Sequence, residues 1–388
     1  MKSNYEPLGK HIRLVDYRNS EEVTSTVLGI SIDKEFMPSV ANVIGTDLSR
    51  YKLISKGLFA CNPMHVGRDE RLPIALYEKD NAAVVSPAYF MFEIIDRDVL
   101  NEEYLMMWFR RPEFDRECWF MTDGSVRGGI TWDDLCRIKL PVPSYARQCE
   151  IVESYRAITN RIALKRAEND NLEATAMSLY KSWFIDYEPF DLDDEGLPVG
   201  WYKAKLNDKL STSTQSINPQ KMDCDFVWHY SIPAYDNEKL PSKDIPSSIL
   251  SNKYIVPPNA ILVSKLNPDT KRIWRSVPCF ENAICSTEFI VFSAKEPTHR
   301  AFYYLLFNTG SFIDFLVSNA TGSTNSRMRV KPASSLDFEF ICPPNEVIDS
   351  FCRKVEPMLQ KIEENHLEIR KLKELIPIAV AKMMSSSR

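Results

Sequence analysis

The 388-residue chain contains few of the residue patterns that support catalysis. It has only 12 glycines and no GxxxxGK[ST] stretch, which excludes a P-loop nucleotide site. Its five histidines are scattered, and neither an HExxH pair nor a GxSxG turn occurs, so no zinc-hydrolase or serine-hydrolase centre is indicated. No apolar run is long enough to cross a membrane, and the N-terminal residues lack the apolar core of a signal peptide.

Paired cysteines and an excess of positive charge are also absent from the sequence. The nine cysteines form no CxxC pair and are odd in number, which favours reduced thiols in a cytoplasmic protein over disulfides or a metal site. The formal net charge is −5, so the chain is not a generally basic nucleic-acid binder. Any contact with DNA must therefore come from local clusters of cations.

A long heptad pattern occurs twice, 200 residues apart. Apolar residues recur at alternating steps of three and four, which places them on one stripe of a helix. Three polar residues, Lys165, Asn169 and Asn365, occupy central positions of the pattern, where polar side chains cost stability but fix the register of packed helices. We expect the two helices to pack antiparallel along a seam formed by Ile151, Tyr155, Ile158, Ile162, Lys165, Asn169, Leu172, Val355, Met358, Ile362, Asn365, Ile369 and Leu372.

The duplication extends into the segments that precede each helix. A β-rich stretch at 85–92 recurs at 285–292, an aromatic helix at 104–109 recurs at 302–307, and a strand ending in proline at 138–143 recurs at 338–343. The sequence therefore predicts an α+β fold in which two pseudo-symmetric α/β globules are joined by two long helices packed as an antiparallel coiled coil. The expected boundaries are a first globule at 1–143, a first helix at 144–185, a linker at 186–200, a second globule at 201–343 and a second helix at 344–388.

Cations cluster in loops at matching places of the two halves, together with Asn, Ser and Thr. Arginine can bind guanine through two hydrogen bonds, asparagine can bind adenine in the same way, and hydroxyls bind phosphate. A solvated surface loop would explain any one of these residues equally well, but their paired placement favours DNA binding. The candidate DNA contacts are Asn62, His65, Arg68, Arg71, Ser125 and Arg127 in the first half, and Lys265, Asn267, Lys271, Arg272, Arg275, Ser323, Thr324, Asn325, Arg327 and Arg329 in the second.

Several local strings are more specific than this layout. They are Gly124-Ser125-Val126-Arg127, the strand 138–143 with Gln148-Cys149-Glu150-Ile151 after it, Trp183-Phe184-Ile185-Asp186-Tyr187-Glu188-Pro189-Phe190, and Leu197-Pro198-Val199-Gly200-Trp201. With these strings the chain resembles, over nearly its full length, the specificity subunit of Type I restriction–modification systems. The second half departs from the pattern at residues 345–348, where the Pro-x-x-x-Gln stretch does not recur.

The resemblance implies a non-catalytic subunit with two target recognition domains, each reading one half of a bipartite, asymmetric site in double-stranded DNA. It further implies that the helices set the spacing and dock two methyltransferase subunits, and that restriction subunits complete the complex. S-adenosylmethionine, ATP and Mg would bind to those partners, so no cofactor or metal is expected in this chain.

Two other interpretations are compatible with the sequence. One is a similar recognition subunit of a Type IIB system, whose partner is a fused nuclease and methyltransferase. The other is a scaffold in which the globules bind proteins rather than DNA. The recognised DNA sequence itself cannot be predicted, because loop conformation decides which side chain meets which base.

Overall fold

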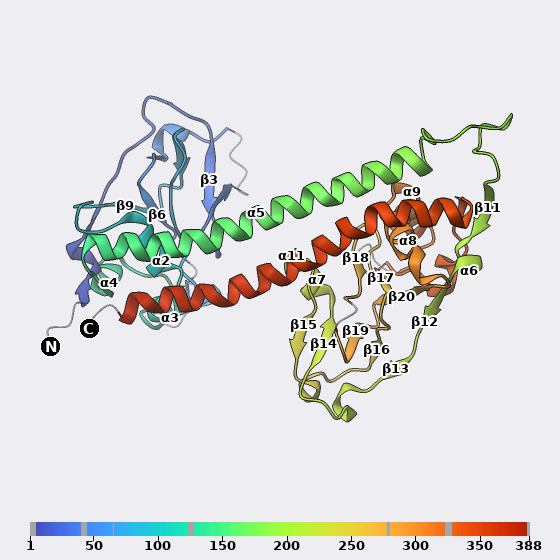
Figure 1. The fold of residues 1–388 in the computed structure, drawn as a ribbon. Coiled ribbons are helices and arrows are strands. Elements are labelled where there is room, and N and C mark those ends of the chain that lie inside the picture. Colours follow the sequence, from blue (N-terminus) through green and yellow to red (C-terminus); the bar gives the residue numbers. More distant parts are fainter. Residues whose placement is uncertain are drawn as a thin grey trace. The chain divides into compact units, whose positions relative to one another are not determined.

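A computed structural model describes residues 5–39, 45–64, 66–122, 128–277, 280–322 and 328–385, with side chains to residue 381 (Figure 1). The chain forms two compact units. Unit 1 comprises Met1–Arg161 and Leu372–Arg388, and unit 2 comprises Ile162–Lys371. No helix in the described part of the chain has both the length and the apolar character needed to cross a membrane.

Unit 1 contains two small four-stranded sheets and a separate strand pair. The first sheet is antiparallel, in the order β2 (Ile12–Leu14), β9 (Phe90–Ile94), β6 (Phe59–Cys61) and β7 (Ile74–Leu76). The second has the order β4 (Phe36–Pro38), β3 (Val27–Ile30), β8 (Ala83–Val85) and β5 (Lys52–Ile54), and its β3–β8 pair is parallel. Strands β1 (Tyr5–Pro7) and β10 (Lys139–Pro141) pair with each other.

The helices of unit 1 have recognisable start signals. Asn101 caps α2 (Glu102–Phe109), Pro112 occupies the first turn of α3 (Pro112–Phe120), and Thr131 caps α4 (Trp132–Arg137). All residues of α2 from Tyr104 to Phe109 are buried, so this helix forms the centre of the unit's core. The short elements are α1 (Val66–Asp69), η1 (Leu8–Lys10) and η2 (Leu48–Arg50).

Unit 2 repeats this architecture. One sheet has the order β12 (Leu210–Ser213), β20 (Phe289–Ala294), β17 (Ile261–Ser264), β18 (Ile273–Arg275). The other has the order β13 (Ser216–Ile217), β16 (Lys253–Ile255), β19 (Ala283–Cys285), β14 (Val227–Tyr230), β15 (Ser242–Asp244), with a parallel β14–β19 pair. The remaining elements are the pair β11 (Tyr202–Lys205) and β21 (Glu339–Cys342), helices α6 (Leu206–Lys209), α7 (Ile232–Glu238), α8 (Arg300–Phe307), α9 (Gly310–Ser318) and α10 (Pro332–Ser335), and η3 (Pro219–Lys221), η4 (Pro246–Ser248) and η5 (Pro297–His299).

The sheets correct one prediction and confirm the fold class. Residues 85–92 and 285–292 do not form single strands, because the chain leaves one sheet after β8 or β19 and enters the other at β9 or β20. Ser86 and Pro87 lie in the first of these turns. The predicted α+β fold with two similar halves is confirmed, since the strands common to both halves follow the same order and include the matching parallel pair, while β13 is an additional edge strand in unit 2.

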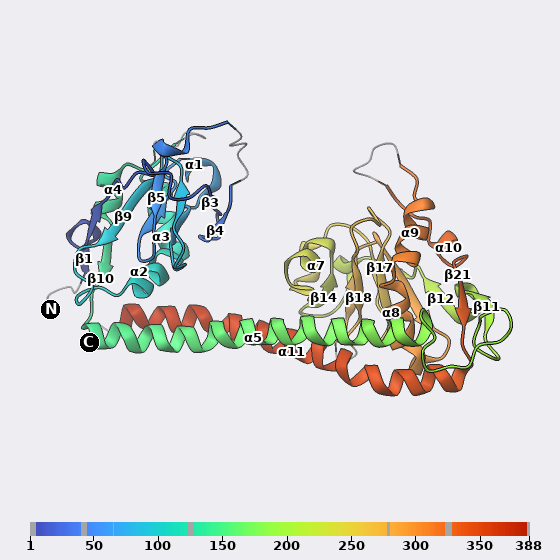
Figure 2. The same ribbon diagram turned by 90° about the horizontal axis from the view of Figure 1, so that it is seen from above.

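The two long helices are α5 (Tyr145–Phe184) and α11 (Asn345–Ser385). Within unit 2 they run antiparallel, since Tyr180 contacts Phe351 near one end and Lys165 bonds to Asn365 further along. Figure 2 shows α8, β17 and β18 on one side of these helix segments. The sheet, α8 and both helices share one apolar core there. In unit 1, Ile151 and Val152 of α5 belong to the core of the first globule, and Val380 of α11 packs against it.

Candidate nucleic-acid interface

In unit 2 the two predicted cationic loops are adjacent. The β17–β18 loop (265–272) bonds to the segment before α10, since Asn267 N donates to Met328 O at 2.8 Å and Val330 N donates to Lys265 O at 3.0 Å. Asn267 adopts the left-handed conformation (φ 48°), and its Oδ1 accepts from Met328 N at 3.2 Å. Asn267 therefore holds the two loops together.

Unit 1 joins the equivalent loops in the same way. Ile130 N donates to Pro63 O at 3.1 Å, and Gly67 N donates to Gly128 O at 3.0 Å. A Cβ atom at Gly129 would lie 2.8 Å from Pro63 O, so this close approach requires glycine. Asn62 has a local role as well, because its Oδ1 accepts from Met64 N at 3.2 Å.

Three of the predicted arginines make the same two-point contact with a carboxylate. Each donates from Nε and Nη2 to the two oxygens of one acid, and none of these acids is among the predicted DNA contacts. The pairs are Arg68 with Asp69 (2.6 and 2.9 Å), Arg272 with Asp236 (2.7 and 2.9 Å), and Arg329 with Glu288 (3.0 and 3.1 Å). In each case the hydrogen bond to the carboxylate raises the pKa of the arginine.

The end of the β6–β7 loop is fixed to the globule by a buried lysine. Lys34, 4% exposed, donates to Asp115 Oδ1 at 2.6 Å and to Leu72 O at 2.9 Å, and Leu72 N donates to the same carboxylate at 3.0 Å. Burial lowers the pKa of Lys34, against the opposing effect of Asp115. Next to this anchor, Arg71 Nη1 lies 3.2 Å from Asp33 Oδ1.

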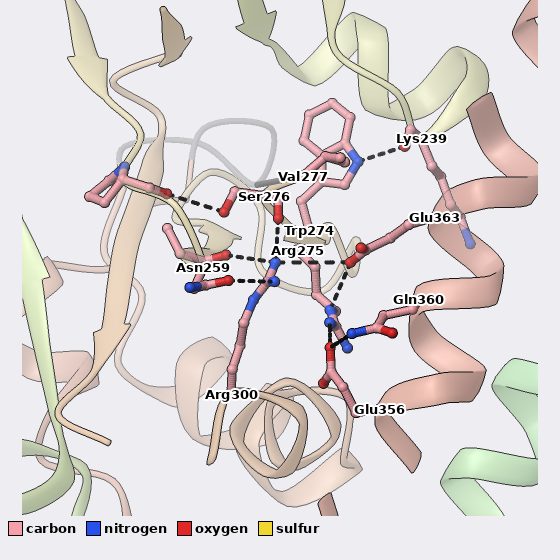
Figure 3. A network of polar contacts seen from close by, with 12 residues as sticks. Lys239, Asn259, Trp274, Arg275, Ser276, Val277, Arg300, Glu356, Gln360 and Glu363 are labelled. Atoms are coloured by element: carbon pink, nitrogen blue, oxygen red, sulfur yellow. Dashed lines mark hydrogen bonds and ion pairs between the residues drawn. The ribbon is translucent and has the colours of Figure 1, made fainter. Parts of the chain in front are cut away.

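Arg275 is not at the surface with the other cations. Only 6% exposed, it donates to Glu356 at 2.5 Å and lies 3.0 Å from Glu363, and both glutamates belong to α11 (Figure 3). Burial alone would lower the pKa of Arg275, but the two glutamates raise it. Arg300 completes the cluster and bonds to Ser276 O. The prediction that Arg275 contacts DNA is therefore corrected, because its side chain joins the globule to the helix.

The other predicted contacts divide into two groups. Lys265 is half-buried and Lys271 is exposed. The remaining residues lie outside the part of the chain that the structure describes, and they are His65, Ser125, Arg127, Ser323, Thr324, Asn325 and Arg327.

The predicted helix seam is buried or half-buried at every position, including Ile158 and Leu172. Its polar centre forms a network within unit 2. Lys165 donates to Asn365 Oδ1 at 3.0 Å, and Asn365 donates to Asn169 Oδ1 at 2.8 Å. Lys165 also lies 3.0 Å from Glu168 and 3.4 Å from Glu368, so its charge is balanced in the seam.

The side chains that hold these loops and arginines in place could not have been found from the sequence. Asp236 precedes Arg272 by 36 residues and Lys34 precedes Asp115 by 81, and no repeat or motif links the members of either pair. Asp69 differs from these residues, because it directly follows Arg68 and the sequence alone places the two side by side.

These features define a duplicated α+β protein in which each half presents a pair of bonded, arginine-containing loops. A solved structure with this fold is the Type I restriction–modification S subunit from M. genitalium, with a TM-score of 0.59 and 12% identity over 98% of this chain and 95% of that one.

Two curated relatives bear the same description. The MjaIX specificity subunit of Methanocaldococcus jannaschii is 23% identical over 317 residues, 75% of this chain and 70% of the relative. The HindI specificity subunit of Haemophilus influenzae is 20% identical over 330 residues, 66% and 70% respectively. No protein-family model matches the chain. The resemblance to Type I specificity subunits seen in the sequence is thereby confirmed.

Proposed function

We propose that the chain is the DNA sequence-recognition subunit of a Type I restriction–modification complex. In this proposal each globule reads one half of a bipartite, asymmetric site in double-stranded DNA, and the chain itself is not catalytic. The loops at 62–71 and 265–272, with the segments bonded to them, supply the contacts.

One observation carries the proposal: the same pair of bonded loops occurs at corresponding places of both halves. In each half the loop between the third and fourth strands of the first sheet meets the segment that precedes the short helix α4 or α10. Each pair carries arginines suited to base edges or phosphates. Two globules of similar fold whose loops carry different residues are suited to a DNA site with two different halves.

The long helices have a different role in this proposal. The boundary between the units falls inside both α5 and α11, so each helix contributes to both units. We propose that the helix pair sets the distance between half-sites and docks two methyltransferase subunits, and that restriction subunits join the complex. S-adenosylmethionine, ATP and Mg would be held by those partners.

Single-molecule sequencing of methylated adenines tests the proposal. Cells would express this chain with the methyltransferase subunit of its own system, and cells with the methyltransferase alone would be the control. We expect methylation at one motif of two defined blocks separated by a fixed unspecified gap. Absence of a chain-dependent motif, or a motif with one continuous block, would contradict the proposal.

A further inference from the structure

The three arginine–carboxylate pairs in the loops share a geometry that restricts what those arginines can bind. A guanidinium has five N–H donors in one plane. The carboxylate uses the Nε–Nη2 edge, so a second planar acceptor can bind at the Nη1–Nη2 edge at the end of the side chain. Because the carboxylate fixes the plane of the guanidinium, that second edge has a defined direction.

Such a pair is poorly suited to holding phosphate. Attraction to the DNA backbone depends on net positive charge and on the release of counterions. The pair of an arginine and a carboxylate has no net charge, and the acid repels a phosphate nearby. A guanine edge, in contrast, is neutral and presents the acceptors N7 and O6 in the major groove, where an oriented guanidinium binds both.

Resting on the function proposed above, we propose that these acids are positioning residues for base-reading arginines, and that each half-site contains guanine read from the major groove. The positioning residues are Asp69, Asp236 and Glu288, which orient Arg68, Arg272 and Arg329 respectively.

The Asp236–Arg272 pair carries the argument furthest. Asp236 lies on α7, in the connection between β14 and β15, whereas Arg272 lies at the end of the β17–β18 loop. The Arg272 side chain is only 15% exposed, so packing and the carboxylate of Asp236 together restrict its orientation. Unit 1 has a counterpart, since Asp33 in the β3–β4 connection contacts Arg71 at the end of the β6–β7 loop. The recurrence shows that an ion pair at this place belongs to the fold of both halves, whereas the contact through Nε and Nη2 is made by Arg272, and Arg71 contacts its acid through Nη1.

The replacement Asp236→Asn separates a positioning role from an ordinary surface ion pair. It removes one negative charge near the DNA, so binding to unrelated DNA should become tighter. It also releases the guanidinium, so discrimination between the correct half-site and a mutated one should fall. A purely structural pair would change thermal stability and leave discrimination as it was.

The experiment measures DNA binding by the full chain in complex with its methyltransferase subunit. In a set of duplexes, the guanines of the half-site read by the second globule are replaced one at a time by 7-deazaguanine, which lacks N7. We expect at least one replacement to weaken binding of the unmodified complex about 5- to 150-fold. Arg272→Ala should abolish that sensitivity and Asp236→Asn should reduce it, while Asp236→Glu, which keeps the carboxylate, should restore part of it. Glu288→Gln provides a second, independent variant that acts on Arg329.

A matched control is Glu93→Gln in unit 1. Arg13 contacts Glu93 Oε1 through Nε at 2.8 Å and Nη2 at 2.7 Å, but this pair lies on β2 and β9, away from the loop that follows β6. Its removal should leave discrimination unchanged. Two results would overturn the inference and leave the proposed function intact. One is specific binding to a half-site that lacks guanine. The other is that the Asp236→Asn and Glu288→Gln variants discriminate between the correct and the mutated half-site as well as the unmodified chain does. No sequence-specific binding by the complex would overturn both.

Discussion

Removing Glu363 should destabilise unit 2 strongly, because this glutamate balances buried positive charge. The cluster at the β18–α11 contact contains two arginines, Arg275 and Arg300, and two glutamates, Glu356 and Glu363, so it is neutral as a whole (Figure 3). Both arginine side chains are 5% exposed and Glu363 is 17% exposed. Breaking a buried ion pair from one side costs about 3–5 kcal/mol, and Glu363→Ala should fall near 3 since Glu363 keeps some exposure.

A loss of about 3 kcal/mol should lower the unfolding temperature of a unit of this size by roughly 6–12 °C. Calorimetry on the full chain measures the change, and hydrogen exchange at α8 and β18 assigns the transition to unit 2. The control is Glu364→Ala, on the same helix, because within the described residues Glu364 pairs with Lys361 alone, in an exposed contact at 3.2 Å. Its effect should stay within about 0.5 kcal/mol.

The double variant Arg275→Leu with Glu363→Ala tests the physical cause. Leu76 pairs with Phe59 in unit 1 as Arg275 pairs with Ile261 in unit 2, so the fold already accepts leucine at that sheet position. Removing both charges leaves the cluster neutral again. We expect the double variant to cost at least about 1–2 kcal/mol less than the sum of the single variants. Additivity within about 0.5 kcal/mol would refute the view that an unbalanced buried charge is what destabilises Glu363→Ala.

Two further predictions concern the loop anchor and the helices. Asp115→Ala should destabilise unit 1 by about 3–5 kcal/mol, because Lys34 would keep a buried charge without its carboxylate. The Leu72 amide, which donates to Asp115, should then lose its protection from hydrogen exchange. Unchanged protection of this amide would contradict the anchoring role of Asp115. Inserting four residues beside Lys165 should lengthen α5 by about 6 Å and widen the unspecified gap of the methylated motif by one to two base pairs. An unchanged gap would contradict the proposal that the helix pair sets the spacing between half-sites.

The repeat and the fold class could be predicted because they rest on periodic patterns. The heptads place apolar residues on one helical stripe, and the polar positions Lys165, Asn169 and Asn365 stand out within it. The structure links these three side chains by hydrogen bonds. The turn between β8 and β9 was missed, because both flanking strands are apolar and periodicity alone gives no break at residues 86–89.

The role of each cation could not be predicted, because a loop sequence does not specify burial. Arg272 and Arg275 are three residues apart, and both read as members of one basic cluster. The structure gives Arg272 a carboxylate from α7 and gives Arg275 two from α11. Only the pairing of β17 with β18 and the packing of β18 toward α11 separate the two, and these depend on contacts across long stretches of sequence.

The ion pairs between each globule and its long helix oppose an exchange of the two halves. In unit 1, Arg156 of α5 pairs with Glu103 of α2. The heptad equivalent of Arg156 in the second helix is Glu356, which pairs with Arg275 in unit 2, so the sign of the charge on the helix is reversed between the halves. The first globule placed on the unit 2 segment of α11 would bring Glu103 toward Glu356. Like charges brought together in this way oppose the wrong pairing. The same heptad position of the helix therefore pairs with the globule in both halves, but through α2 in unit 1 and through β18 in unit 2, and with opposite charges.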